Sequence, residues 1–189
     1  MLLATGGLAC DPALAHDAFG GGKPLFSGAA HLLTSPLSLA AMFGLLASAA
    51  DAKDPWPIIA GAIAGTLAVV GVMLPQALAY WMGPVGAILV GLVAAAGLKP
   101  VPWGLAALAL AAGLAAGASA QLDVPTWPAA LGAGAVAFIA IAAGLAAFDA
   151  VPNSARLQSA VAIGRRIAGA WVVAIGALLG ALAVKLHTM

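Results

Sequence analysis

The sequence predicts an all-α integral membrane protein, and composition is the first reason. Of its 189 residues, 64% are hydrophobic and 7% are charged, whereas about a quarter of the residues of a soluble domain are charged. The mean hydropathy is +1.12. Apolar stretches near the ~20 residues that a helix needs to cross the hydrocarbon core alternate with short segments rich in proline and charge. We therefore expect a bundle of six transmembrane helices.

Prolines and charges place the boundaries of these helices. The expected spans are 25–50, 58–80, 85–98, 103–120, 129–148 and 160–186. The segment WMGP (81–84) is expected to form a turn between the second and third spans. The indoles of Trp56, Trp81, Trp103 and Trp127 fall at expected span ends, where a side chain that is half apolar and half polar is favoured. Residues 25–189 are thus expected to form a single transmembrane domain.

Residues 1–24 are interpreted as an N-terminal arm. The tripeptide ALA before His16 resembles a signal-peptide cleavage site. No basic segment precedes it, however, and Asp11 and Pro12 interrupt the apolar run. We interpret the arm as an uncleaved relic of a signal sequence.

Lys and Arg are distributed unevenly between the two sides of the expected bundle. The first, third and fifth connections and the start of the last helix hold five of them: Lys53, Lys99, Arg156, Arg165 and Arg166. The other side holds Lys23 and Lys185. Because positively charged connections stay in the cytoplasm, we expect both termini on the outer, periplasmic side of a bacterial inner membrane. The side chains of Arg165 and Arg166 are expected to extend toward the membrane surface.

Small residues predict how the helices pack. Three G-x-x-x-G pairs occur within expected spans, in GAIAG (61–65), GLAAG (113–117) and GALLG (176–180). Such a pair clears one helix face, so that a neighbouring backbone can approach closely. We interpret the three pairs as general packing faces rather than as a dedicated dimerisation motif.

Several functions are disfavoured by the sequence. The net charge of +1, without a basic patch, argues against a nucleic-acid partner. The single cysteine, Cys10, cannot form an internal disulfide. The chain contains no Ser-His-Asp, Cys-His, H-E-x-x-H, Walker or Rossmann pattern, and the glycine-rich AFGGGKP (18–24) lacks the spacing of a phosphate-binding loop. We therefore expect no enzymatic activity.

The outer end of the bundle holds the candidate metal ligands. His31 is the one titratable side chain expected a turn or two inside an apolar span, where ionisable groups are costly and mark functional candidates. A metal site needs several converging nitrogen, oxygen or sulfur ligands, and His16, Asp17 and Asp123 are expected on the same side as His31. The alternative is a structural role, in which His31 is hydrogen-bonded to a backbone carbonyl or a serine.

Two stretches, HLLTSPLSLAAM (31–42) and AGASAQLDVP (116–125), carry a family resemblance, with PALAH (12–16) before them and a glycine-rich last helix after them. In their order and position they resemble the HupE/UreJ family of six-helix membrane proteins. Members of that family are associated with hydrogenase and urease and are regarded as nickel permeases. The resemblance covers nearly the whole chain in its layout.

The first stretch is similar to the family pattern H-P-L-T-G-x-D-H-L-x-A-M. His31 matches its first histidine, whereas Leu37 stands at the aspartate and Ser38 at the second histidine. The resemblance therefore implies that His31 is the ligand retained in this stretch.

The second stretch takes the place of the family pattern H-G-x-A-H-G-x-E-x-P. Ala116 and Ala120 stand at its two histidines, and Asp123 replaces its glutamate. Of the ligands that the resemblance implies, His31 and Asp123 remain.

Three functional interpretations follow from these residues. The resemblance implies transport of nickel or another divalent ion for metalloenzyme maturation, along a path that begins at His31 and Asp123. The loss of the other ligands favours a non-transporting accessory or scaffold subunit, docked in a larger membrane complex. A third interpretation is that His31 is an axial ligand of a haem or another pigment.

Overall fold

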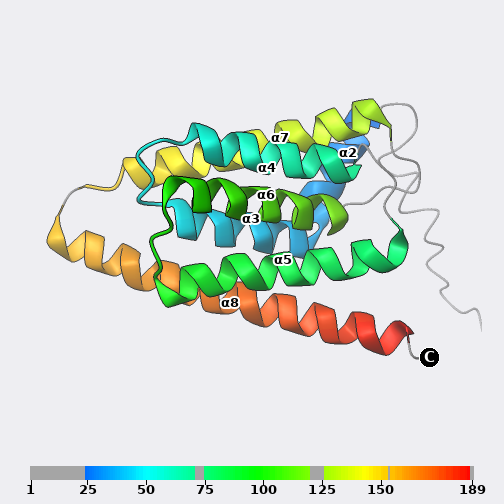
Figure 1. Cartoon of the computed structure of the whole chain (residues 1–189). Coiled ribbons are helices and arrows are strands. Elements are labelled where there is room, and N and C mark those ends of the chain that lie inside the picture. Colours follow the sequence, from blue (N-terminus) through cyan, green and yellow to red (C-terminus); the bar gives the residue numbers. More distant parts are fainter. Residues whose placement is uncertain (1–23, 71–74, 120–125, 153, 188–189) are drawn as a thin grey trace, which may run out of the picture.

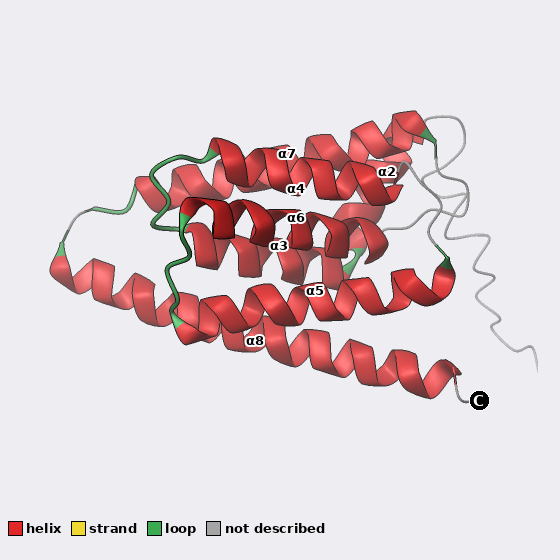
Figure 2. Ribbon diagram, viewed as in Figure 1, coloured by secondary structure: helices red, strands yellow, loops and turns green. Residues whose placement is uncertain are grey.

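The computed structural model describes residues 24–70, 75–119, 126–152 and 154–187. These residues form seven α-helices and no strand, which confirms the all-α prediction (Figures 1 and 2). The helices are α2 (Pro24–Thr34), α3 (Pro36–Ala49), α4 (Trp56–Val70), α5 (Gln76–Ala96), α6 (Pro102–Ser119), α7 (Trp127–Asp149) and α8 (Ala155–His187).

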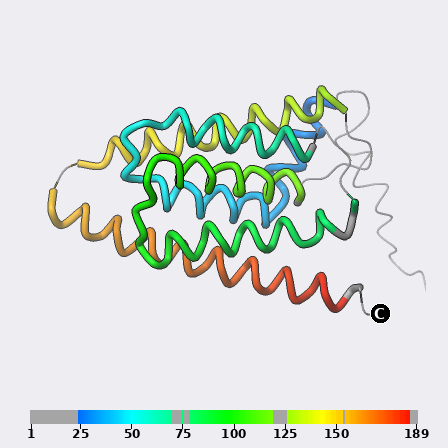
Figure 3. The backbone as a smooth tube through the Cα atoms, in the orientation of Figure 1, coloured from blue at the N-terminus to red at the C-terminus, as the bar shows by residue number. Residues whose placement is uncertain are grey.

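Helices α3 to α8 run along the length of the bundle (Figure 1). At one end α3, α5 and α7 finish, and α4, α6 and α8 begin; we call this the charged end. At the other end, α2 crosses near the start of α7 and meets α3 at a bend of 71°, visible in the backbone trace (Figure 3). We call this the break end. The three connections at the charged end are those expected to carry the excess of Lys and Arg.

Helix length and apolar composition separate the helices into two groups. Among the described residues, α5 (Leu78–Ala96), α7 (Trp127–Asp149) and α8 (Ala155–Lys185) are long and apolar enough to cross a membrane, and α2 with α3 adds a fourth span if the bent pair is counted as one. Helices α4 and α6 are apolar but shorter. The structure thus supports a helical membrane protein, although the six full-length spans and the side on which the termini lie are not confirmed.

The expected turn at 81–84 is wrong. These residues lie inside α5, which starts after Pro75 and continues through Pro84. Proline inside a helix removes one backbone hydrogen bond and favours a break. Here α8 presents glycines to this part of α5: a Cβ at Gly180 would lie 3.3 Å from the Pro84 ring, and one at Gly176 would lie 3.1 Å from the Pro84 carbonyl oxygen. Close packing against a partner helix therefore accompanies a continuous α5 where the local sequence favours a turn.

Glycines and alanines bring the helices into close pairs, as the G-x-x-x-G spacing predicts. Helix α4 packs on α6, α5 on α8 and α2 on α7. A Cβ at Gly113 would overlap the carbonyl of Ala62, and one at Gly132 would overlap the carbonyl of Leu25. These backbones can approach only because the side chain is absent. Helix α3 fills the middle, and nearly all of its residues from Ser38 to Ala49 are buried.

Candidate functional site

The helix break at Ser35 follows from the two residues Ser35 and Pro36. Pro36 is the first residue of α3, a position where its missing N–H costs nothing. The Ser35 hydroxyl accepts a hydrogen bond from the Ser38 N–H at 3.2 Å and so caps α3. The Ser35 N–H still donates to the His31 carbonyl at 3.1 Å, which completes the last turn of α2. The expected single span 25–50 is therefore two helices.

His31 lies in the last turn of α2, directly before the break. His31 is half-buried. The neighbouring Thr34 hydroxyl donates to the Ala30 carbonyl at 2.9 Å. The break thus gathers one imidazole and several hydroxyls in a chain that is otherwise strongly apolar.

Ser38 makes the most informative contact at the break end. It is fully buried on α3, and its hydroxyl donates to the Ala116 carbonyl of α6 at 2.8 Å. Ser38 and Ala116 belong to the two stretches that resemble HupE/UreJ patterns, and each stands where those patterns have a histidine. The fold brings the two positions into direct contact, and there the hydroxyl of Ser38 and the carbonyl of Ala116 are bonded to each other.

Comparisons with protein-family models, curated proteins and solved structures give no match to this chain. The resemblance to HupE/UreJ proteins therefore depends on the residues quoted above and on their order along the chain. The contact between Ser38 and Ala116 is a spatial relation between the two stretches that their sequences do not state.

Of the four predicted metal ligands, the structure places His31. His16, Asp17 and Asp123 lie outside the described residues. Within the described ranges, no three His, Cys, Asp or Glu side chains gather in a way that could hold a metal ion.

A second site, at the charged end, is centred on Asp51 after α3. Its Oδ2 atom lies 3.0 Å from Arg165 Nη1 of α8 and 3.1 Å from Lys99 Nζ of the α5–α6 connection. Arg165 Nε also donates to the carbonyl of Ala47, in the last turn of α3. The side chain of Arg165 is only 13% exposed, and it reaches toward the charged end of the bundle between α8 and α3. It turns inward because a carboxylate and a helix C-terminus offer it partners inside the protein.

Arg166, the next residue, bonds to the C-terminal end of α5 as Arg165 bonds to that of α3. Its Nη2 donates to the Ala96 carbonyl at 3.3 Å. Helix α5 stops there because Gly97 adopts a left-handed backbone with φ +66°, and the Leu98 N–H turns back to the Val93 carbonyl at 3.1 Å. Adjacent arginines on α8 thus stabilise the C-termini of two different helices.

The charges around Asp51 favour its ionised form. Partial burial raises the pKa of the Asp51 carboxyl, but hydrogen bonds from Arg165 and Lys99, with the attraction of both cations, outweigh this effect. The pKa of Asp51 therefore lies below its usual value of 3.8. At neutral pH this carboxylate is a permanent counter-ion for both cations.

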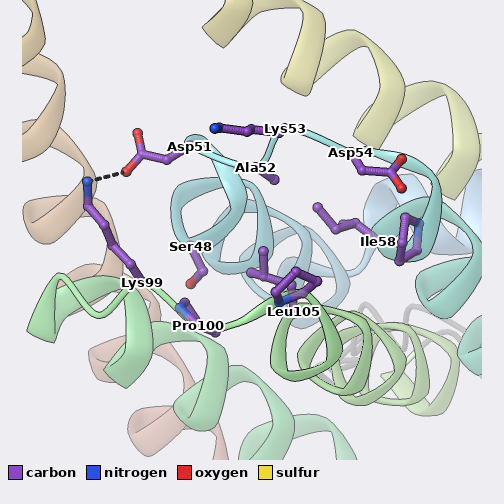
Figure 4. Close-up of a pocket in the computed structure, with 11 residues that line it drawn as sticks. Ser48, Asp51, Ala52, Lys53, Asp54, Ile58, Lys99, Pro100 and Leu105 are labelled. Atoms are coloured by element: carbon purple, nitrogen blue, oxygen red, sulfur yellow. Dashed lines mark ion pairs between the residues drawn. The ribbon is translucent and has the colours of Figure 1, made fainter.

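A pocket of about 290 Å³ opens beside this cluster (Figure 4). Its apolar lining includes Ile58 of α4 and Leu105 of α6. The remaining lining residues are Ser48, Asp51, Ala52, Lys53, Asp54, Pro57, Lys99, Pro100 and Pro102. This site is not predicted by any motif in the sequence. Its signal was the charge and proline content of DAKDPWP (51–57) and KPVP (99–102), which are far apart in the sequence and meet only in the fold.

Proposed function

We propose that this protein is a HupE/UreJ-like protein of the bacterial inner membrane that conducts a divalent metal ion, with nickel as the first candidate. Both termini would lie on the periplasmic side, and the path would begin at the break end. The observation that carries the proposal is the discontinuity between α2 and α3 beside His31.

Broken helices have a chemical use within a membrane. Where a helix is interrupted, backbone carbonyls at one helix end and N–H groups at the other become available to an ion or a small solute, and transporters form sites from such ends. At this break the chain adds the imidazole of His31 and the hydroxyls of Thr34 and Ser35. Nitrogen and oxygen ligands suit nickel and its neighbours among the divalent metals.

The contact between Ser38 and Ala116 favours a second candidate, a non-transporting accessory subunit of a larger membrane complex. It fills the position where the related patterns carry histidines. Within the described residues, every buried side-chain nitrogen or oxygen has a hydrogen-bond partner. Buried polar groups that are satisfied by one another hold helices together and offer little to an ion.

Uptake of Ni²⁺ by cells that express the intact chain tests the first candidate. We expect uptake above that of vector-only cells, loss of the excess in His31→Ala, and retention of the excess in Gly164→Ala. Gly164 is a suitable control because nothing lies within 4 Å of a Cβ at that position. Expression in the membrane is measured for each variant by immunoblot.

Uptake that equals the vector level for all proteins, at normal expression, would contradict the transport proposal. Isolation in a mild detergent then tests the second candidate. A stoichiometric partner that co-purifies with the chain would support the accessory role, and a lone monomer would contradict it.

A further inference from the structure

We infer that the pocket at the charged end binds the phosphate headgroup of an anionic phospholipid. The position of the pocket is the first argument. The spanning segment of α5 ends at Ala96, three residues before Lys99, which lines the pocket. If α5 crosses the bilayer, the pocket lies where the hydrocarbon ends and the lipid headgroups begin.

The second argument is the balance of charge. Lys53 and Lys99 line the pocket, and Arg165 is paired with its lining residue Asp51; the carboxylates in the lining are those of Asp51 and Asp54. These five groups together carry a net charge of about +1 at neutral pH. Basic pockets beside membrane helices attract anionic lipid headgroups.

Both carboxylates are already counted in this balance, and both are bonded to groups of the protein. Asp51 is paired with Arg165 and Lys99. The Asp54 Oδ1 atom accepts a hydrogen bond from the Trp56 N–H at 3.1 Å, at the start of α4. Lys53 forms no ion pair with any described residue, and its ammonium therefore keeps its donors for an anion. Lys99, whose side chain is 78% exposed, keeps donors as well.

The third argument separates a lipid from a free phosphate ion. Most of the lining that carries no charge is apolar, from Ile58, Leu105 and three prolines. A bare phosphate gains nothing from such a surface, whereas the glycerol and first methylenes of a lipid can bury apolar area against it. Phosphate chemistry and apolar chemistry occur side by side, and a phospholipid supplies both.

Binding of phosphatidylglycerol to the full-length protein tests the inference. The protein is placed in nanodiscs of phosphatidylcholine that contain increasing fractions of phosphatidylglycerol, and bound lipid and thermal stability are measured. We expect phosphatidylglycerol to bind and to raise the unfolding temperature. Lys53→Gln and Lys99→Gln should each weaken its binding about fivefold, and the double variant about 20-fold.

Arg156→Gln is the matched control. Arg156 lies at the same end of the bundle and is exposed, but it does not line the pocket. The Arg156→Gln substitution removes one positive charge, as the lysine substitutions do. If binding depends on the pocket, it should change the affinity for phosphatidylglycerol by less than about twofold. Equal weakening by Arg156→Gln would show general attraction to an anionic surface and would overturn the inference.

Three further measurements complete the test. Ala52→Leu adds apolar volume inside the pocket lining without a change of charge, and it should also weaken phosphatidylglycerol binding. Thermal stability in pure phosphatidylcholine shows whether each variant folds. If inorganic phosphate stabilises the protein as much as phosphatidylglycerol does, the site binds a free anion. If phosphatidylcholine and phosphatidylglycerol bind equally, the site does not select an anionic headgroup. Either result would contradict the proposal.

Discussion

Backbone groups at helix ends lack partners within their own helix, and the two ends of the bundle supply these partners in different ways. At the break end the hydroxyls of Ser35 and Thr34 bond to nearby backbone groups. At the charged end Arg165 and Arg166 reach from α8 to the last turns of α3 and α5. The first solution is neutral and, apart from the bond of Ser38 to the Ala116 carbonyl of α6, local. The second is long-range and ionic.

This difference matters because it determines what holds each end in place. The short-range hydroxyl bonds at the break end cap α3 but do not attach α2 to the rest of the protein. That attachment depends on close backbone packing, in which Gly28 lies against the Ala129 carbonyl of α7. At the charged end, the side chains of Arg165 and Asp51 connect α8 directly to α3. We expect steric changes to damage the break end most and changes of charge to damage the other.

The largest effect is expected from Gly28→Leu. A Cβ at Gly28 would overlap the backbone of Ala129, and a backbone carbonyl cannot rotate away as a side chain can. Overpacking of this kind costs about 3 kcal/mol or more, and we expect α2 to separate from α7. Unfolding in detergent measures the loss. Gly164→Leu, where a Cβ meets nothing within 4 Å, should change stability by less than about 0.5 kcal/mol; equal losses in both variants would contradict the packing explanation.

Arg165→Met should have an intermediate effect, at the charged end. It removes an ion pair with Asp51 and leaves the Ala47 carbonyl without its bond from α8. Because hydrogen bonds to charged groups are worth about 1.5–3 kcal/mol, we expect a loss of about 2 kcal/mol in the free energy of unfolding. Arg166→Met is the matched comparison.

Arg166 makes one bond of 3.3 Å to Ala96, which is exposed. Its replacement should cost less than about 1 kcal/mol. If the two methionine variants lose the same stability, the inward position of Arg165 is not what stabilises this end.

The smallest effect is the pH dependence that Asp51 contributes. Its pKa is lowered in the folded protein from 3.8, so its stabilising contribution is complete above pH 3.8 and is lost as the pH falls below that value toward the folded pKa. The side chain is 45% exposed, and solvent screening keeps the contribution below about 1 kcal/mol. The free energy of unfolding is measured between pH 6 and pH 2.5 for the native chain and for Asp51→Asn. The variant should lack the part of the acid-induced loss of stability that Asp51 contributes. Identical pH profiles of the two proteins would show that the ion pairs are not stabilising.

The class of the protein and the positions of its two longest apolar helices follow from the sequence alone. An apolar run bounded by proline and charge has few alternatives to a helix in a membrane, because its backbone must satisfy its own hydrogen bonds. The last two helices were accordingly placed well, with 129–148 expected and Trp127–Asp149 found, and 160–186 expected and Ala155–His187 found. The sequence also puts His31 inside an apolar helix, and it lies in the last turn of α2.

Features that the local sequence leaves ambiguous depend on contacts between helices. Pro84 continues a helix because the glycines of α8 accommodate it, whereas Pro36 begins a new one because Ser35 caps it. Arg165 turns inward toward Ala47, 118 residues away, and Ser38 bonds to Ala116, 78 residues away. A hydropathy pattern reports only the neighbours of a residue along the chain. The partners that decide a proline, an arginine or a serine come from other helices, and only the packed bundle brings them together.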